Sequence, residues 1–163
     1  MSDTRKKFGN AFEGKWCMLR DMDPIEAHDL FKLRQNVFIL EQTSLYQDID
    51  GRDPEALHLI VHDKTSGVLV GTIRLMTEPE TVSARIGRVA IAPEGRGTGL
   101  GRKLMEAGIE KAEALVEGCS IDLSAQAHLE KFYKSLGFET ISAIYLEDGI
   151  PHVDMIRRGR APG

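Results

Sequence analysis

The segment from Val89 to Arg102 constrains the fold of this chain more than any other part of its sequence. A short apolar stretch ends in a glycine-rich turn, and the residues after the turn have the spacing of an amphipathic helix. A strand that leads into a helix and then into another strand requires a crossover and parallel pairing of the two strands. The segment therefore predicts a layered fold, α/β or α+β, with a mixed sheet and helices on its faces.

Apolar periodicity and turn residues indicate the remaining elements. Asp23, Pro24 and Glu26 have the pattern of a capped helix start. We expect helices over residues 23–38, 99–116 and 128–136, and strands over residues 16–19, 57–62, 68–76, 85–91, 121–125, 141–146 and 152–156. The polar segment 41–56 is expected to be a long loop, and loops of this length in compact domains are often functional.

Length and composition are typical of one globular domain. The 163 residues suit a single domain with a core over about 15–157 and loose ends at 1–12 and 158–163. The formal net charge of −4 disfavours general binding of nucleic acid. No apolar run is long enough for a membrane helix and no secretory signal is found, so we expect a cytoplasmic protein without a membrane partner. Cys17 and Cys119 fit no metal-ligand spacing, so buried thiols and no metal site are expected.

The glycine-rich turn is predicted to bind an anion. The first turn of a helix has unpaired N–H groups and a partial positive charge. Glycines allow the backbone to approach a ligand closely and to adopt positive φ angles. Arg96, Arg102 and Lys103 add formal positive charge beside the turn. Together these features indicate a phosphate site at the start of the helix.

Two common phosphate-binding patterns do not fit this turn. The third glycine of the dinucleotide pattern falls on Arg102, and no Gly-Lys-Ser/Thr follows as in nucleoside-triphosphate loops. The pattern that fits is Arg-x-x-Gly-x-Gly, at Arg96–Gly101. The alternative is a glycine-rich connection that binds nothing. That alternative leaves the glycines at the helix start unexplained, because each costs about 0.5–1 kcal/mol relative to alanine within a helix.

These motifs resemble those of one enzyme family. Arg96–Gly101, preceded by Arg88–Ile91 and followed by Phe132–Phe138, resembles the GNAT acetyltransferases. The resemblance covers about residues 15–157. A narrower resemblance, to the ElaA-like branch of the family, rests on Glu41-Gln42, Tyr46–Gly51 and Gly149–His152.

The resemblance implies a GNAT fold, with a central, mostly antiparallel sheet, helices on both faces and one parallel strand pair that splays apart. It implies that acetyl-CoA is the acetyl donor, bound between the splayed strands without a metal. The pantetheine arm is expected to pair with the backbone of Val89, Ala90 and Ile91, and the pyrophosphate to lie on Gly97–Arg102. Gln126 could also reach the pantetheine arm; the alternative is that its side chain makes only a turn contact. The expected cofactor-binding residues are Val89, Ala90, Ile91, Arg96, Gly97, Thr98, Gly99, Leu100, Gly101, Arg102 and Gln126.

Acetylation of an amine sets further requirements. An alkyl ammonium has a pKa of about 10.4, so about one molecule in two thousand is neutral at pH 7 and able to attack a carbonyl. The site therefore needs a base, acting directly or through water, and an N–H group for the carbonyl oxygen, expected near Ile91. Tyr133 is the candidate donor to the leaving thiolate. The alternative is that Tyr133 fills the core beside Phe132 and Phe138.

Glu41 and His152 are the candidates for the base, or for residues that hold the acceptor. Arg74 and Arg88 lie on expected strands, where ion pairs are the expected role.

Fold alone does not identify the acceptor. A small-molecule amine is expected, and the acidic residues Asp48, Asp50 and Asp53 hint at a cationic one. Alternatives are a CoA-binding or acyl-CoA-binding module without turnover, or an acyltransferase that makes acyl-homoserine lactones or modifies a protein N-terminus. A homodimer, formed through the edge of the last hairpin, is a further expectation.

Overall fold

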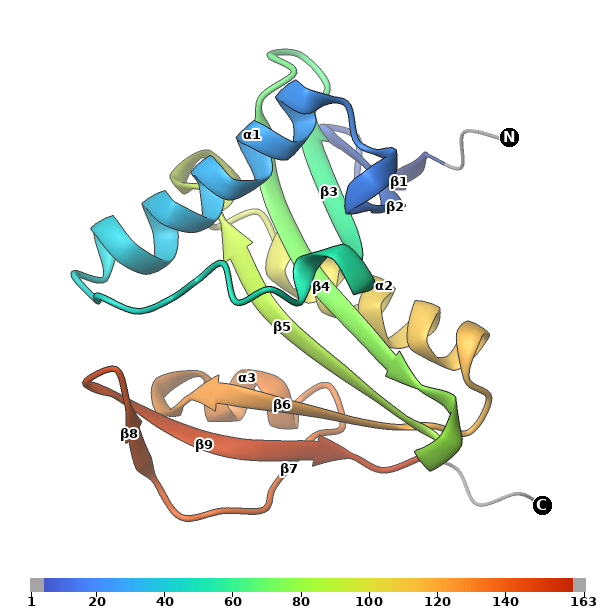
Figure 1. Ribbon diagram of the computed structural model, residues 1–163, viewed down its shortest axis with the longest axis vertical. Coiled ribbons are helices and arrows are strands. Elements are labelled where there is room, and N and C mark those ends of the chain that lie inside the picture. Colours follow the sequence, from blue (N-terminus) through green and yellow to red (C-terminus); the bar gives the residue numbers. More distant parts are fainter. Residues whose placement is uncertain (1–4, 160–163) are drawn as a thin grey trace. The chain divides into compact units, whose positions relative to one another are not determined.

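The computed structural model describes residues 5–159 (Figure 1). The chain divides into two compact units, of which the first takes in residues 1–74 and 88–105 and the second residues 75–87 and 106–163, as far as each range is described. Strands β4 (Leu69–Glu78) and β5 (Ser83–Ile91) and helix α2 (Leu100–Leu115) contribute residues to both units. The division therefore does not test the prediction of a single domain.

The strands of the described residues follow the order β1-β2-β3-β4-β5-β6-β9-β7, and β8 also pairs with β9. Strand β2 is antiparallel to β1 and β3, and β9 is antiparallel to β6, β7 and β8. Strands β5 and β6 run parallel, which confirms the predicted crossover and mixed sheet. The bounds of these strands are β1 (Lys6–Phe8), β2 (Phe12–Met18), β3 (Leu57–Asp63), β6 (Ser120–Gln126), β7 (Glu139–Thr140), β8 (Tyr145–Glu147) and β9 (Ile150–Arg157).

The first unit contains a hairpin that the sequence analysis missed. Residues 1–12 were expected to be a loose end, but β1 pairs with β2 in the register Phe8↔Phe12. Both phenylalanines are buried, and Gly9 has a φ of 78° in the turn between them. Burial of Phe8 and Phe12 on either side of the glycine turn therefore holds this segment in the sheet. Its charged residues alone would favour a solvent-exposed chain end. Residues 1–4 lie outside the described range.

Helix α1 (Pro24–Arg34) begins where the sequence predicts. The Asp23 carboxylate accepts hydrogen bonds from the backbone of Ile25 and Glu26, both at 2.9 Å, and the Glu26 side chain accepts one from the Asp23 N–H. The prediction of one helix up to residue 38 is wrong, because the α-helix ends at Arg34. From Gln35 to Glu41 the chain continues as a π-helix, a rare form that occurs frequently at functional sites.

Helix α2 packs its predicted apolar face against the sheet. In the first unit, α1 lies in front of the strands and the first turns of α2 lie behind them (Figure 1). Leu100 and Leu104 are buried, and an added Cβ at Gly71 of β4 would lie 3.3 Å from each of them. This close approach fixes the start of α2 on the strand beneath it. Leu115 is the last residue of the helix and is 49% exposed.

The second unit departs from prediction after β6. The expected helix 128–136 is a 3-10 turn, Ala127–Leu129, followed by the short helix α3 (Glu130–Lys134), and Gly137 ends it with a φ of 93°. The expected strand 141–146 is confirmed only at Tyr145 and Leu146, which lie in β8 and form a hairpin with β9. Strand β9 pairs with β7 at Met155–Ile156 and with β8 at Ile150–His152, and residues 142–144 between them belong to no strand. None of the helices within residues 5–159 is long and apolar enough to cross a membrane.

Candidate functional site

The glycine turn has the backbone that an anion site requires. Strand β5 ends at Ile91, Pro93–Gly95 form one turn of 3-10 helix, and α2 begins at Leu100. Gly97 and Gly99 have φ angles of 72° and 79°. A Cβ at either position would meet no atom of the protein within 4 Å. These glycines are therefore required by backbone conformation, and open space lies beside them.

The turn is held rigidly on its inner side. The Thr98 hydroxyl donates a hydrogen bond of 2.6 Å to the Gly95 carbonyl, and the Ala92 N–H donates one of 2.8 Å to Val70. A Cβ added to Gly101 would lie 3.2 Å from the Ile91 side chain, so this glycine serves close packing. Because the first N–H groups of an α-helix find no carbonyl acceptor within the helix, the start of α2 is a place where an anion can bind.

Arg96 has a partner that the sequence did not reveal. Its guanidinium donates two hydrogen bonds to the Glu41 carboxylate, at 2.5 and 2.6 Å, and its Nε donates one to the Ile91 carbonyl at 3.2 Å. The pair lies half-exposed, and the hydrogen bonds from Arg96 lower the pKa of Glu41. A carboxylate held in this way is a weak base, and it neutralises the charge of Arg96. The two residues are 55 positions apart, so no local pattern predicts the pairing.

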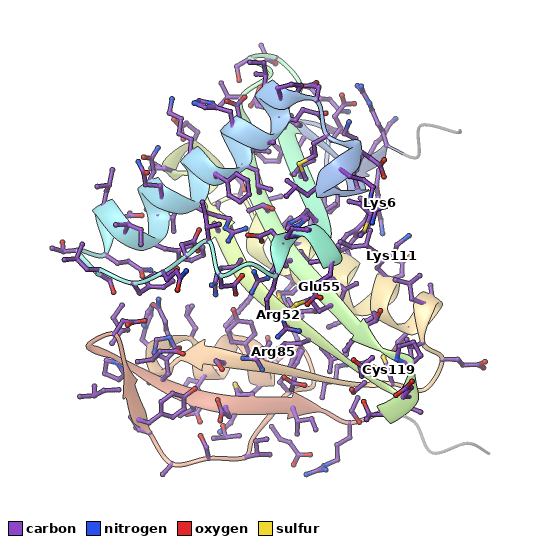
Figure 2. The ribbon with its side chains drawn as sticks, in the orientation of Figure 1. Lys6, Arg52, Glu55, Arg85, Lys111 and Cys119 are labelled. Carbon is purple, nitrogen blue, oxygen red and sulfur yellow. The ribbon has the colours of Figure 1, made fainter. Side chains whose placement is uncertain are left out.

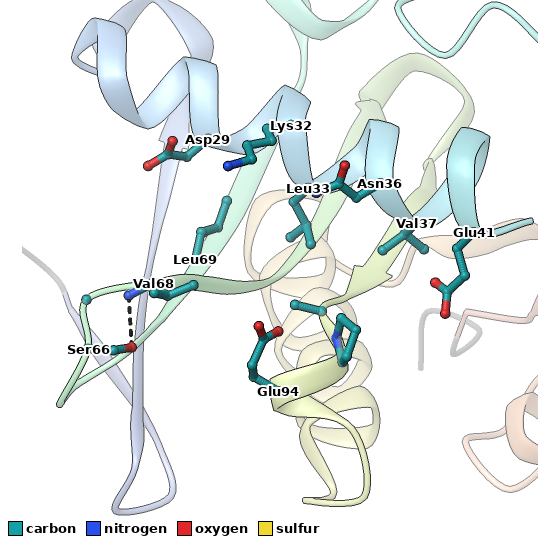
Figure 3. Close-up of a pocket in the computed structure, with 13 residues that line it drawn as sticks. Asp29, Lys32, Leu33, Asn36, Val37, Glu41, Ser66, Val68, Leu69 and Glu94 are labelled. Atoms are coloured by element: carbon teal, nitrogen blue, oxygen red, sulfur yellow. Dashed lines mark hydrogen bonds between the residues drawn. The ribbon is translucent and has the colours of Figure 1, made fainter.

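A pocket of about 690 Å³ lies beside Glu41 within the first unit (Figure 3). One wall is α1 with the π-helix, and the other is the turn before β4 together with the residues that follow β5. Leu33, Val37 and Leu69 form buried apolar parts of the lining. Lys32 and Glu94 are among the polar residues that line it. Its volume is in the range of small-molecule sites.

The acidic residues of the 46–53 segment do not form a free cation site. Asp48, Asp50 and Asp53 pair with Arg34, Arg74 and Arg88 in the first unit. This confirms the ion pairs expected for Arg74 and Arg88. It corrects the suggestion that these three aspartates are available to a cationic acceptor, because each carboxylate already has arginine partners.

Tyr133 lies on α3 in the second unit and is 7% exposed. Its ring makes edge contacts with Phe132 and Phe138, at centroid distances of 5.1 and 6.1 Å. Burial raises the pKa of Tyr133 to about 12. The phenol therefore keeps its proton. Tyr133 packs as a core residue would, and its hydroxyl can still serve as a hydrogen-bond donor.

His152 has a defined tautomer. Its Nδ1 lies 2.7 Å from the carbonyl oxygen of Ile150, and because a carbonyl can only accept, Nδ1 carries the proton. In the neutral ring Nε2 is then an acceptor, and it lies 3.5 Å from the Glu147 carboxylate. The ring stacks on Tyr145, and His152 pairs across the sheet with Gln126. The second unit thus brings together two of the predicted site residues, His152 and Gln126.

A polar cluster beside His152 was missed by the sequence analysis. The Asp154 carboxylate accepts hydrogen bonds from the Tyr145 hydroxyl at 2.5 Å and from the Ser124 hydroxyl at 3.2 Å. Arg85 (Figure 2) donates to Ser124 at 2.8 Å and pairs with Asp122. Polar residues alternate with apolar ones along β6, and this alternation was the available signal. Within residues 5–159 no group of three metal-binding side chains occurs.

Comparison with known proteins gives consistent matches. A family model described as an acetyltransferase (GNAT) domain matches residues 26–158. A UPF0039 protein of Schizosaccharomyces pombe is 39% identical over 135 residues, 82% of this chain and 89% of the relative. Protein ElaA of Escherichia coli K12 is 35% identical over 133 residues, 81% of this chain and 87% of the relative.

Two solved structures share the fold and more than 30% of the sequence. An acyl-CoA N-acyltransferase from Pseudomonas aeruginosa superposes with a TM-score of 0.82 at 37% identity, covering 90% of this chain and 99% of that one. The Escherichia coli ElaA structure has a TM-score of 0.81 at 32% identity, with the same coverage.

Proposed function

Because the chain belongs to the GNAT acetyltransferase family, in its ElaA-like branch, we propose that it transfers the acetyl group of acetyl-CoA to an amine. The family acts on small-molecule or peptide acceptors, and the acceptor of this chain is proposed to be a small-molecule or peptide amine. The membership confirms the resemblance drawn from the glycine turn and from the segment around Tyr133.

The glycine turn carries this proposal. Gly97 and Gly99 hold positive φ angles with open space beside them, directly before the N-terminus of α2. A strand that leads through a turn with left-handed residues into a helix start is the backbone arrangement in which anion sites commonly occur. The amides of residues 97–102 would hold the pyrophosphate of CoA. Since Arg96 is paired with Glu41, these amides and the helix dipole, rather than that guanidinium, supply the local positive potential.

The backbone before the turn supports the same ligand. The parallel ladder between β5 and β6 joins Ser83–Arg85 to Ser120–Asp122, and both strands continue beyond it. Val89, Ala90 and Ile91 lie outside this ladder. A strand edge without a neighbour offers N–H and C=O groups to an extended ligand. The amide-containing pantetheine arm is such a ligand, and we assign its binding to these three residues.

The thioester supplies the acetyl group, and Tyr133 is assigned a hydrogen bond to the departing sulfur. With pKa values of about 12 for Tyr133 and about 8.5 for a thiol, complete proton transfer to the thiolate is uphill by about 5 kcal/mol. Ordinary pKa values give about 2 kcal/mol for the same transfer. Tyr133 therefore acts in this scheme as a donor that keeps its proton.

His152 is assigned the role of base. Its Nε2 lone pair is fixed by the hydrogen bond at Nδ1, and Glu147 lies where it stabilises the imidazolium that forms. Glu41 is assigned a different role from the one first expected. Because its pKa is lowered by Arg96, Glu41 is proposed to orient Arg96 on the glycine turn rather than to accept a proton.

Two measurements test the proposal. Calorimetric titration with CoA and with acetyl-CoA should give saturable binding at one site. An amine panel, assayed by the release of free CoA thiol, should then identify an acceptor whose acetylated product appears in equal amount by mass spectrometry. Saturable binding without turnover on any amine would support a CoA-binding module instead. Absence of binding by folded protein would refute both readings.

A further inference from the structure

A cluster of six charged residues, four of them buried, joins the 46–53 segment to three elements of the first unit. It contains three arginines, from α1, β4 and β5, and three aspartates from the 46–53 segment, so its formal charges cancel. Its members are Arg34, Arg74, Arg88, Asp48, Asp50 and Asp53. Buried ion pairs often contribute little net stability. We therefore ask whether this cluster positions a part of the chain.

The inner part of the cluster centres on Arg34, which is completely buried. Arg34 is 0% exposed, and its Nε donates to the Asp48 carboxylate at 2.9 Å and its Nη1 to Asp53 at 2.7 Å. Arg74 donates two hydrogen bonds of 2.9 Å to the two oxygens of Asp50, and one of 3.2 Å to Asp53. These forked contacts fix both the position and the orientation of the 46–53 segment.

The outer part of the cluster holds a strained residue of β5. Arg88 has a φ of 52°, which a residue with a side chain rarely adopts, and it lies within a strand. Its Nη2 donates to the Asp48 carbonyl at 3.0 Å and to the Asp50 carboxylate at 3.3 Å, and its Nε lies 2.9 Å from the Asp48 carboxylate. The guanidinium also lies over the ring of Tyr46, whose hydroxyl donates to Asp48. A backbone strain of this kind persists only where its surroundings hold it.

We propose that Asp48, Asp50 and Tyr46 are positioning residues for acetyl-CoA, because they hold Arg88 in the left-handed conformation. This inference rests on the proposed function. Arg88 directly precedes Val89–Ile91, the backbone assigned to pantetheine. One left-handed residue changes the direction in which the following N–H and C=O groups point. If Arg88 returned to an extended conformation, the groups of Val89–Ile91 would rotate away from their present direction.

Substitutions at Arg88 separate this role from direct contact with the ligand. Glycine adopts a positive φ without strain and alanine does not, so Arg88→Gly should keep CoA affinity within about threefold of the wild type, whereas Arg88→Ala should weaken it about tenfold. Val82 has a φ of 50° and lies in the second unit, so Val82→Gly and Val82→Ala are matched controls. Neither control should change the Kd for CoA. Equal losses for Arg88→Gly and Arg88→Ala would overturn the proposal.

Hydrogen exchange in the ligand-free protein provides a readout that does not depend on CoA. Asp50→Asn keeps the size of the side chain but removes the charge that faces Arg74 and Arg88. Among the amides of Val89–Ile91, those that pair with β4 should exchange at least about tenfold faster in this variant, while amides of β9 should be unchanged. Unchanged exchange at Val89–Ile91 would also overturn the proposal. If the wild type bound no CoA, the proposed function would fail, and this measurement would still decide whether the cluster holds the strand.

Discussion

Gly97, in the glycine turn, and Gly67, outside it, have nearly the same backbone conformation. Comparing an alanine substitution at each position therefore separates the effect of the turn on ligand binding from its effect on folding. Gly97 has a φ of 72° and Gly67, in the turn before β4, has a φ of 73°; a Cβ at either position would meet no atom within 4 Å. Alanine at either position therefore meets the same conformational strain, about 1–2 kcal/mol, and no steric clash. Gly97→Ala and Gly67→Ala should lower the free energy of unfolding by similar amounts.

Their effects on CoA binding should differ. If Gly97→Ala displaces one backbone N–H from the pyrophosphate, the loss is a hydrogen bond to a charged group, about 1.5–3 kcal/mol. This corresponds to a rise in Kd of about 10- to 150-fold. Calorimetric titration with CoA, with urea unfolding of the same samples, measures both quantities. Equal affinities for the two variants, at equal stability, would refute the assignment of the pyrophosphate to this turn.

Three further predictions concern the remaining groups. Tyr133→Phe should lower kcat at least about tenfold in steady-state assays and leave the Kd for CoA unchanged. His152→Gln should lower kcat/KM by about 100-fold, and raising the pH should restore part of the rate because more acceptor amine is then neutral. Burial alone would raise the pKa of Asp53, but Arg34 and Arg74 hold it below its usual value. The resulting stability is present above about pH 4 and is lost as the pH falls through the folded-state pKa, so urea unfolding of Asp53→Asn should depend less on acid than the wild type.

The parts of the fold that could be predicted are those set by residues close together in sequence. The capping box at Asp23 needs only Glu26 three positions later, and it is present as predicted. The glycine turn, the parallel strands on either side of α2 and the buried face of α2 follow from apolar spacing and from the position of the glycines. Such features depend on backbone conformation and on local hydrogen bonds, both of which neighbouring residues determine.

The parts that could not be predicted depend on pairs distant in the sequence. No local pattern shows that Arg96 will take Glu41 as its partner, because the two residues are 55 positions apart and Glu41 ends a π-helix where a loop was expected. Likewise, the acidic residues of the 46–53 segment read as a solvated loop until their arginine partners are known. The short strand β1 was missed because its sequence is mostly charged. Only Phe8, which is buried and pairs with Phe12 of β2, indicates that it belongs to the sheet.

Several departures from regular backbone in the first unit lie at the proposed acetyl-CoA site. Arg88 and the two glycines of the turn have positive φ angles on either side of Val89–Ile91, and the π-helix places Glu41 against Arg96. The left-handed Arg88 and the π-helix carry a conformational cost that regular strand and helix avoid. Packing does not explain the two glycines, since a Cβ at Gly97 or Gly99 would meet no atom within 4 Å. Acetyl-CoA has amide groups that can bond Val89–Ile91 and a diphosphate that can bond the glycine turn, so one ligand accounts for these backbone features. We therefore assign acetyl-CoA to β5 and the glycine turn rather than to the pocket beside Glu41.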